Sequence, residues 1–162
     1  MTFCEDLHDL LCDAARDTFQ AYGTVAQLLH AVSMSTNPQL GAVLGLTGYE
    51  LNCTVLVVAD PITLSTTNPT PNVADSKWLG EATNQIAGRF KNELARRGID
   101  VAMAVPVVLS ATRLVPMVRN STEPIHLRIE HAYMTIWLEY EGELELPEPR
   151  CEVTREGEAL LF

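Results

Sequence analysis

The chain has 162 residues, 47% of them hydrophobic, and its formal net charge at pH 7 is −10. A chain of this length can bury about 70% of its unfolded surface as one unit, so we expect residues 1–162 to form a single domain. The eleven Lys and Arg residues are scattered. This excludes nucleic acid as a partner, because phosphate backbones are bound by clustered cations, and favours a basic or neutral protein.

We expect neither a targeting segment nor a membrane span. Acidic residues interrupt the first apolar stretch, where a signal peptide would have a basic start and an apolar run. No apolar run reaches the ~18 residues of a membrane helix, so no membrane partner is expected and the location is predicted to be cytoplasmic. The cysteines lack paired spacing, which favours buried thiols over a disulfide or a zinc site; they are Cys4, Cys12, Cys53 and Cys151.

Residues 3–22 are predicted to form an amphipathic helix that ends at Gly23, because apolar residues recur there at helical spacing. The other face carries a stripe of aspartates: Asp6, Asp9, Asp13 and Asp17. We interpret this stripe as a solvated face, with a surface for a basic partner as the alternative. Residues 24–39 could extend a helix or enter a strand, with a turn at Asn37-Pro38.

Two runs rich in Val and Leu, residues 40–47 and 51–60, are predicted to form a hairpin. Gly41 and Gly45 in the first run indicate close packing against a helix, or a bulge. Residues 60–71 contain three prolines with several Ser, Thr and Asn. This composition predicts a loop.

A second long helix is predicted to begin between Asn72 and Ser76 and to end near Arg97. Its apolar residues form a single stripe that must face a core. The members of the stripe are Leu79, Ala82, Ile86, Phe90 and Leu94.

The opposite side of this helix carries Glu81, Asn84, Gln85 and Gly88. Asn and Gly disfavour helix relative to Ala, Gly by about 1 kcal/mol, so helix stability does not explain this composition. Two interpretations are open. The residues form an ordinary solvated face, or they form a docking surface on which Gly88 leaves room for another molecule to reach Glu81 and Asn84.

The rest of the chain is predicted to be mainly strands. Alternating apolar residues over 101–109 predict a central, buried strand. The alternation slips by one position between residues 125–129 and 132–140, so a bulge or a tight reversal is expected in between. Residues 143–146 are a candidate for a further strand. This order of elements predicts an α/β (α+β) fold: an antiparallel or mixed sheet with two long helices packed on it.

We expect no metal site, nucleophile or cofactor of the chain's own. His126 and His131 are an odd number of residues apart, so on a regular strand they would point to opposite faces and could not share a metal. The sequence contains no nucleophile elbow, phosphate-binding loop or dinucleotide fingerprint.

The string Gly80-Glu81-x-x-Asn84-x-Ile86-Ala87-Gly88 on a long amphipathic helix resembles the signature of the CheX and CheC family of chemotaxis phosphatases. These proteins remove phosphate from receiver-domain response regulators such as CheY. Weaker matches flank the string at residues 41–48, 51–59 and 105–108. The single copy of the motif is closer to CheX than to CheC. Family members usually carry another helix before the motif helix, where this chain has the predicted loop.

The resemblance implies a CheX-like domain that acts on the aspartyl phosphate of a CheY-like receiver. Asn84 would orient the attacking water, and Glu81 would pair with the receiver's active-site lysine; Gln85 and Gly88 would lie in the contact area. The chain would bring no cofactor of its own, since Mg²⁺ is bound by the receiver, and CheX-like proteins suggest a strand-mediated homodimer. The alternatives are a non-catalytic scaffold domain, as in FliM, and an unrelated acidic α/β protein.

Overall fold

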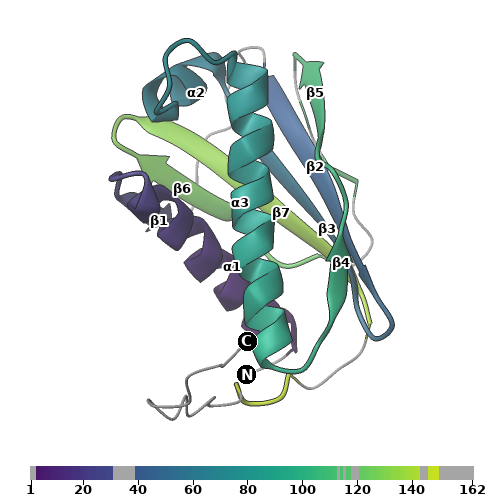
Figure 1. Ribbon diagram of the computed structural model, residues 1–162. Coiled ribbons are helices and arrows are strands. Elements are labelled where there is room, and N and C mark those ends of the chain that lie inside the picture. Colours follow the sequence, from purple (N-terminus) through teal and green to yellow (C-terminus); the bar gives the residue numbers. More distant parts are fainter. Residues whose placement is uncertain are drawn as a thin grey trace, which may run out of the picture.

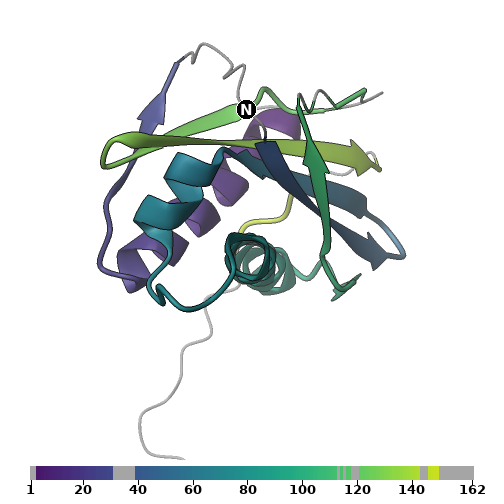
Figure 2. The same cartoon turned by 90° about the horizontal axis from the view of Figure 1, so that it is seen from above.

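In the described part of the chain, seven strands form one antiparallel sheet and three helices cover one of its faces (Figure 1, Figure 2). The computed structural model describes residues 3–30, 39–112, 114, 116–117, 121–142 and 146–149. The elements are α1 (Phe3–Ala21), β1 (Ala26–Leu29), β2 (Gln39–Gly48), β3 (Asn52–Ala59), α2 (Pro61–Thr67), α3 (Asp75–Arg96), β4 (Val101–Met103), β5 (Val107–Ala111), β6 (Ile125–Ile129) and β7 (Ala132–Glu141).

The strand order is β1-β6-β7-β3-β2-β4, and β5 also pairs with β2. The predicted fold class is confirmed, with the sheet antiparallel rather than mixed and a short third helix beside the two long ones. The core lies between the helices and the long central strands. Its fully buried members include Leu7, Leu11, Phe19, Leu44, Leu46, Val55, Val57, Ile86, Phe90, Ile136 and Leu138. None of the helices in these ranges has the length and hydropathy that a bilayer crossing needs.

The predicted first helix and the predicted hairpin of residues 40–47 and 51–60 are confirmed. Gly23 adopts φ +79° and, with Thr24, donates its backbone N–H to carbonyls in the last turn of α1. The ambiguous residues after it include β1, which pairs with β6; Asn37-Pro38 lies outside the described residues. β6 and β7 are joined by Glu130 and His131, with φ +56° at Glu130. This tight reversal explains the slip in the apolar alternation.

The prediction of a central, buried strand over residues 101–109 is wrong. β4 and β5 lie at the edge of the sheet, beside β2, and Val105, Val107 and Leu109 are 83%, 59% and 44% exposed. Three residues, Ala104 to Pro106, lie opposite only Leu44 and Gly45, so the edge bulges outward and its alternation changes phase.

Among the described strands, β1 forms one edge of the sheet and β4 with β5 forms the other. Edge strands present unpaired backbone groups to another chain.

The prediction of a loop over residues 60–71 is also wrong, because Pro61–Thr67 forms α2. Asp60 caps this helix: its Oδ1 accepts a 2.7 Å hydrogen bond from the Thr63 backbone N–H, and Pro61 occupies the first turn, where no N–H is needed. Thr63 Oγ1 donates to the Tyr133 carbonyl at 2.8 Å, and Leu64 is fully buried. Thr63 thus satisfies the backbone carbonyl of Tyr133 in β7.

The two glycines of β2 differ in their surroundings. A Cβ on Gly41 would lie 2.6 Å from Leu114 Cδ1, whereas a Cβ on Gly45 would meet nothing within 4 Å. The close approach at Gly41 is therefore to a residue after β5 and not to a helix. The β2–β3 register runs without a bulge. Residues 143–145 of the candidate strand lie outside the described residues, and Leu146 packs against the core without joining the sheet.

We predict that Asp60→Ala lowers the free energy of unfolding by about 1 kcal/mol, because α2 loses its N-cap. Asp60→Asn keeps a side-chain oxygen at the same place and should unfold close to wild type. Urea denaturation followed by circular dichroism measures both. Equal destabilisation by the two substitutions would contradict the capping role.

Candidate functional site

Helix α3 is fixed to the sheet by one face. The predicted apolar stripe, Leu79, Ala82, Ile86, Phe90 and Leu94, is fully buried. At its N-terminal end the Trp78 indole Nε1–H donates a 3.0 Å hydrogen bond to Thr67 Oγ1 of α2, and its ring packs edge-to-face on Tyr22 at 5.0 Å. These contacts hold the helix against rotation, so its opposite face has a fixed orientation.

That opposite face presents Glu81 and Asn84 one helical turn apart. Glu81 is exposed, and its Oε1 accepts a 2.7 Å hydrogen bond from Gln85 Nε2. Asn84 is half-buried, and within the described residues its carboxamide makes no hydrogen bond. The carboxylate is therefore steadied by its own helix, whereas the amide keeps both its donor and its acceptor available.

Glu81 and Asn84 line the same open groove, which has a volume of about 650 Å³. The groove lies between α3 and the edge formed by β4 and β5. Its other residues are Ser76, Lys77, Gly80, Met103, Ala104, Val105, Pro106 and Val108. Gly80 allows close packing across it, since a Cβ there would already contact Val108 Cγ2 at 3.5 Å and Pro106 Cγ at 3.9 Å.

The sequence did not predict the apolar wall of this groove, formed by Val105, Pro106 and Val108, because the alternation over residues 101–109 indicated one continuous strand. Pro106 within that run was the available signal, since proline is confined to edge strands and bulges. The groove unites Glu81 and Asn84 but does not include Gln85 or Gly88. Gln85 is exposed beside Glu81.

No packing contact in the described part of the chain explains why position 88 of α3 is a glycine. A Cβ at this position would meet nothing within 4 Å. Gly in a helix interior costs about 0.5–1 kcal/mol relative to Ala, so the position loses helix stability without a closer contact in return. The absence of a side chain leaves the helix surface open between Asn84 and the next turn.

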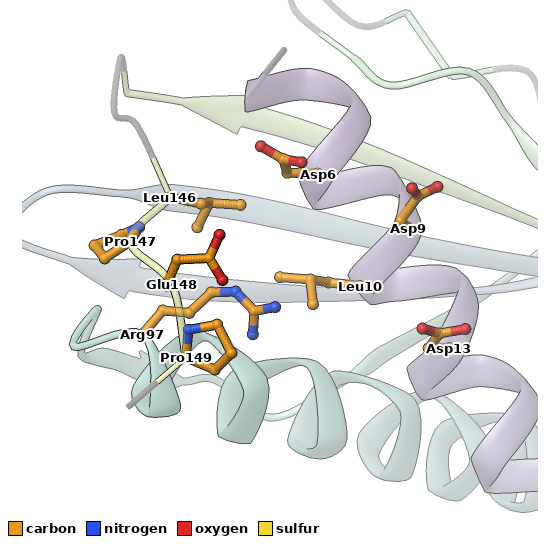
Figure 3. A pocket seen from close by; sticks show the side chains of 9 residues that line it. All are labelled: Asp6, Asp9, Leu10, Asp13, Arg97, Leu146, Pro147, Glu148 and Pro149. Atoms are coloured by element: carbon orange, nitrogen blue, oxygen red, sulfur yellow. The ribbon is translucent and has the colours of Figure 1, made fainter. Parts of the chain in front are cut away.

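A second cavity lies beside the N-terminal half of α1, and Arg97 at the C-terminal end of α3 and residues 146–149 also line it (Figure 3). It measures about 400 Å³ and is lined by Asp6, Asp9, Leu10, Asp13, Arg97 and residues 146–149. Three aspartates of the stripe line this pocket, and Asp9, Asp13 and Asp17 are exposed, as the interpretation of a solvated face requires. The pocket shares none of its lining with the Glu81 groove.

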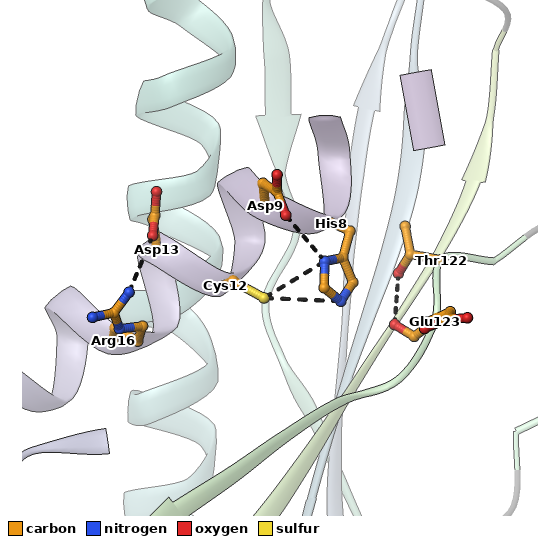
Figure 4. Close-up of polar contacts among 7 residues, drawn as sticks. All are labelled: His8, Asp9, Cys12, Asp13, Arg16, Thr122 and Glu123. Atoms are coloured by element: carbon orange, nitrogen blue, oxygen red, sulfur yellow. Dashed lines mark hydrogen bonds and ion pairs between the residues drawn. The ribbon is translucent and has the colours of Figure 1, made fainter. Parts of the chain in front are cut away.

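A Cys-His-Asp grouping on α1 does not form an activated nucleophile (Figure 4). Cys12 Sγ lies 3.7 Å from His8 Nδ1, and that nitrogen lies 3.4 Å from Asp9 Oδ1. Burial, with added repulsion from Asp9 and Asp13, raises the pKa of the Cys12 thiol to about 12, so at neutral pH it stays protonated. Burial likewise raises the pKa of Cys53 to about 12.

The described residues contain no group of three or more ligands that could hold a metal ion, and Cys4, Cys12 and Cys53 are free thiols. Cys151 lies outside the described residues. The Glu81 groove thus offers a carboxylate, a neutral amide and an apolar wall. Such a site can bind a cation and orient a water molecule on a partner that supplies the reacting group.

No protein-family model and no curated protein matches the sequence. Solved structures do match. CheX from Vibrio vulnificus has a TM-score of 0.71 at 16% identity, covering 87% of this chain and 100% of that one. CheX from Desulfovibrio desulfuricans has a TM-score of 0.68 at 19% identity, covering 84% and 99%.

The CheX of a CheX–CheY–BeF3–Mg²⁺ complex from Borrelia burgdorferi has a TM-score of 0.61 at 13% identity, covering 82% of this chain and 96% of that one. The FliM middle domain from H. pylori also matches, with a TM-score of 0.54 at 12% identity, covering 82% and 86%. The chain therefore has the fold of the CheX- and CheC-like chemotaxis proteins, which the FliM middle domain shares. At these identities the similarity defines the fold only.

We predict that Gly88→Ala raises the free energy of unfolding by about 0.5–1 kcal/mol, because the methyl group enters open space and alanine favours helix. Gly48→Ala is the matched control and should destabilise, since its Cβ would collide with the Asp100 carbonyl oxygen. Thermal or urea unfolding compares the two. A destabilised Gly88→Ala protein would show that the position is not open.

Proposed function

We propose that this protein is a phosphatase that hydrolyses the aspartyl phosphate of a CheY-like receiver domain. The observation that carries the proposal is the placement of Glu81 and Asn84 together on the solvent-facing side of α3, at one groove. The fold it shares with a CheX protein solved in complex with CheY supports a partner of the same class.

The chemistry of an aspartyl phosphate explains why two side chains are enough. The receiver binds Mg²⁺ and places a lysine beside its phosphoryl group, so the reaction lacks mainly a water held in line with the scissile bond. The water oxygen forms a bond to phosphorus while the phosphorus–oxygen bond to the aspartate breaks. The products are inorganic phosphate, a proton and the regenerated carboxylate.

Asn84 has the properties that this water requires. A carboxamide is neutral, so the phosphoryl group does not repel it, and it offers both a donor and an acceptor. Within the described residues, the Asn84 amide has no competing hydrogen bond. In the proposed complex it enters the receiver's pocket and orients the attacking water.

Glu81 holds the complex in register by pairing with the receiver's lysine. Its hydrogen bond from Gln85 limits the positions of the carboxylate before the partner arrives, which lowers the ordering cost of binding. Gln85 thus supports Glu81, and Gly88 leaves the adjoining surface open to the partner.

A non-catalytic binding or scaffold domain in a chemotaxis or two-component pathway is the second candidate. The observation that favours it is the similarity to the FliM middle domain. A scaffold has no requirement for an open carboxamide beside a carboxylate, so these side chains support the phosphatase instead.

We predict that Asn84→Ala abolishes stimulated dephosphorylation while binding to the phosphorylated receiver stays nearly unchanged. In this variant the attacking water loses the carboxamide that orients it, whereas Glu81 remains to pair with the receiver's lysine. Loss of radiolabelled phosphate from the receiver measures the rate, and fluorescence anisotropy measures binding. The same variant should be at least as stable as wild type, because Asn84 makes no hydrogen bond within the described residues and alanine favours helix. An Asn84→Ala protein that still accelerates phosphate loss would remove this residue from the mechanism.

We predict that Glu81→Lys weakens receiver binding and lowers the dephosphorylation rate together, because the receiver's lysine then faces a like charge. Glu81→Gln removes the charge but preserves the shape, and should cause a smaller loss of affinity. Titration of each variant with phosphorylated receiver gives the comparison. Wild-type affinity in Glu81→Lys would rule out the assigned ion pair.

A further inference from the structure

The face of α3 that carries Glu81 and Asn84 continues beyond them as a straight ridge, exposed at Lys77 and Glu81 and half-buried at Asn84, Gly88 and Lys91. Lys77, Glu81, Asn84, Gly88 and Lys91 follow one another at intervals of four, three, four and three residues. At 3.6 residues per turn these positions fall within about 80° of the helix circumference. We call these five residues the α3 ridge. Its two lysines lie about 21 Å apart along the axis, one at each end.

Both lysines are without an ion pair or hydrogen bond within the described residues. Most other described cations have a partner: Arg16 pairs with Asp13, Arg96 and Arg97 pair with Glu93, and Arg128 bonds to Gln27. Lys77 and Lys91 are therefore available to another molecule.

The Glu81–Gln85 hydrogen bond contributes to this availability. Lys77 and Glu81 are four residues apart, a spacing at which an ion pair along a helix is expected. Glu81 instead accepts its hydrogen bond from Gln85, one turn in the opposite direction. Lys77, which lines the same groove as Glu81 and Asn84, has no ion pair within the described residues.

The charge of the whole chain makes the positions of these lysines informative. With a formal net charge of −10, the protein repels an acidic partner at long range. A receiver's phosphorylation pocket is such a partner surface, because Mg²⁺ is held there through carboxylates and phosphate oxygens. Free cations at both ends of the ridge offset that repulsion where the two surfaces meet.

We propose that Lys77 and Lys91 are docking residues that bracket the catalytic pair and bind carboxylates on the rim of the receiver's phosphorylation pocket. This inference rests on the proposed phosphatase function and adds to it the charge pattern of the partner. The ridge selects a receiver with acidic groups on both sides of the pocket. Gly88 leaves space for the partner to approach Lys91 past Asn84.

The test neutralises each lysine and measures phosphate release from a panel of phosphorylated receiver domains of the same genome. Lys77→Gln and Lys91→Gln should each raise KM about twofold to fivefold with kcat unchanged, as for the loss of an exposed ion pair. In the double variant, log(kcat/KM) should also depend less on ionic strength. Arg128→Gln is the matched control: it removes the same charge on β6, away from the groove, and should leave KM unchanged.

The outcomes separate the two proposals. If wild type accelerates phosphate release but the double variant has the KM and salt dependence of the control, the docking role of the lysines is wrong and the phosphatase function stands. A lower kcat at unchanged KM in the double variant would also overturn the docking role. If wild type neither binds nor dephosphorylates any receiver of the panel, the function and this inference fail together.

Discussion

The packing of the α3 apolar stripe against the sheet determines the geometry of the site. Five fully buried side chains over this one helix each contribute to its fixed orientation, and burial of a Leu, Ile or Phe is worth about 1.5–3 kcal/mol. Rotating the helix by one position would expose several of them. Glu81 and Asn84 therefore keep a constant relation to each other and to the sheet edge, although neither is held by a contact across the groove.

The periodic elements were predictable, and the elements that depend on tertiary structure were not. Regular apolar spacing from Leu79 to Leu94, just over four turns, defines both faces of α3, and the phase slip locates the β6–β7 reversal. Alternation cannot distinguish a strand with two neighbours from one with a single neighbour, so β4 and β5 were placed in the centre. α2 was missed because Pro, Ser and Thr dominate its segment, whereas in the structure the Asp60 cap and buried Leu64 stabilise a helix.

In the candidate site, too, some residues could be predicted from the sequence and others depend on tertiary structure. The residues of the exposed face were found because Asn and Gly are poor choices for a solvated helix, and that argument is local. The apolar wall contributed by Val105 and Pro106 and the bond between Gln85 and Glu81 depend on side-chain positions that no spacing specifies. The fold is shared by CheX proteins and by the FliM middle domain, so fold alone does not decide between catalysis and scaffolding. The decision rests on two side chains at the groove, exposed Glu81 and half-buried Asn84.

The central claim is that this protein supplies catalysis to another protein's phosphorylated pocket. The most direct measurement is the rate of phosphate loss from a phosphorylated receiver domain with and without the wild-type protein at a small fraction of the receiver concentration. Our account predicts that one molecule of the protein dephosphorylates many receivers, so the rate rises in proportion to the amount added. A receiver that binds the protein but loses phosphate at its unassisted rate would contradict the account and identify a scaffold instead.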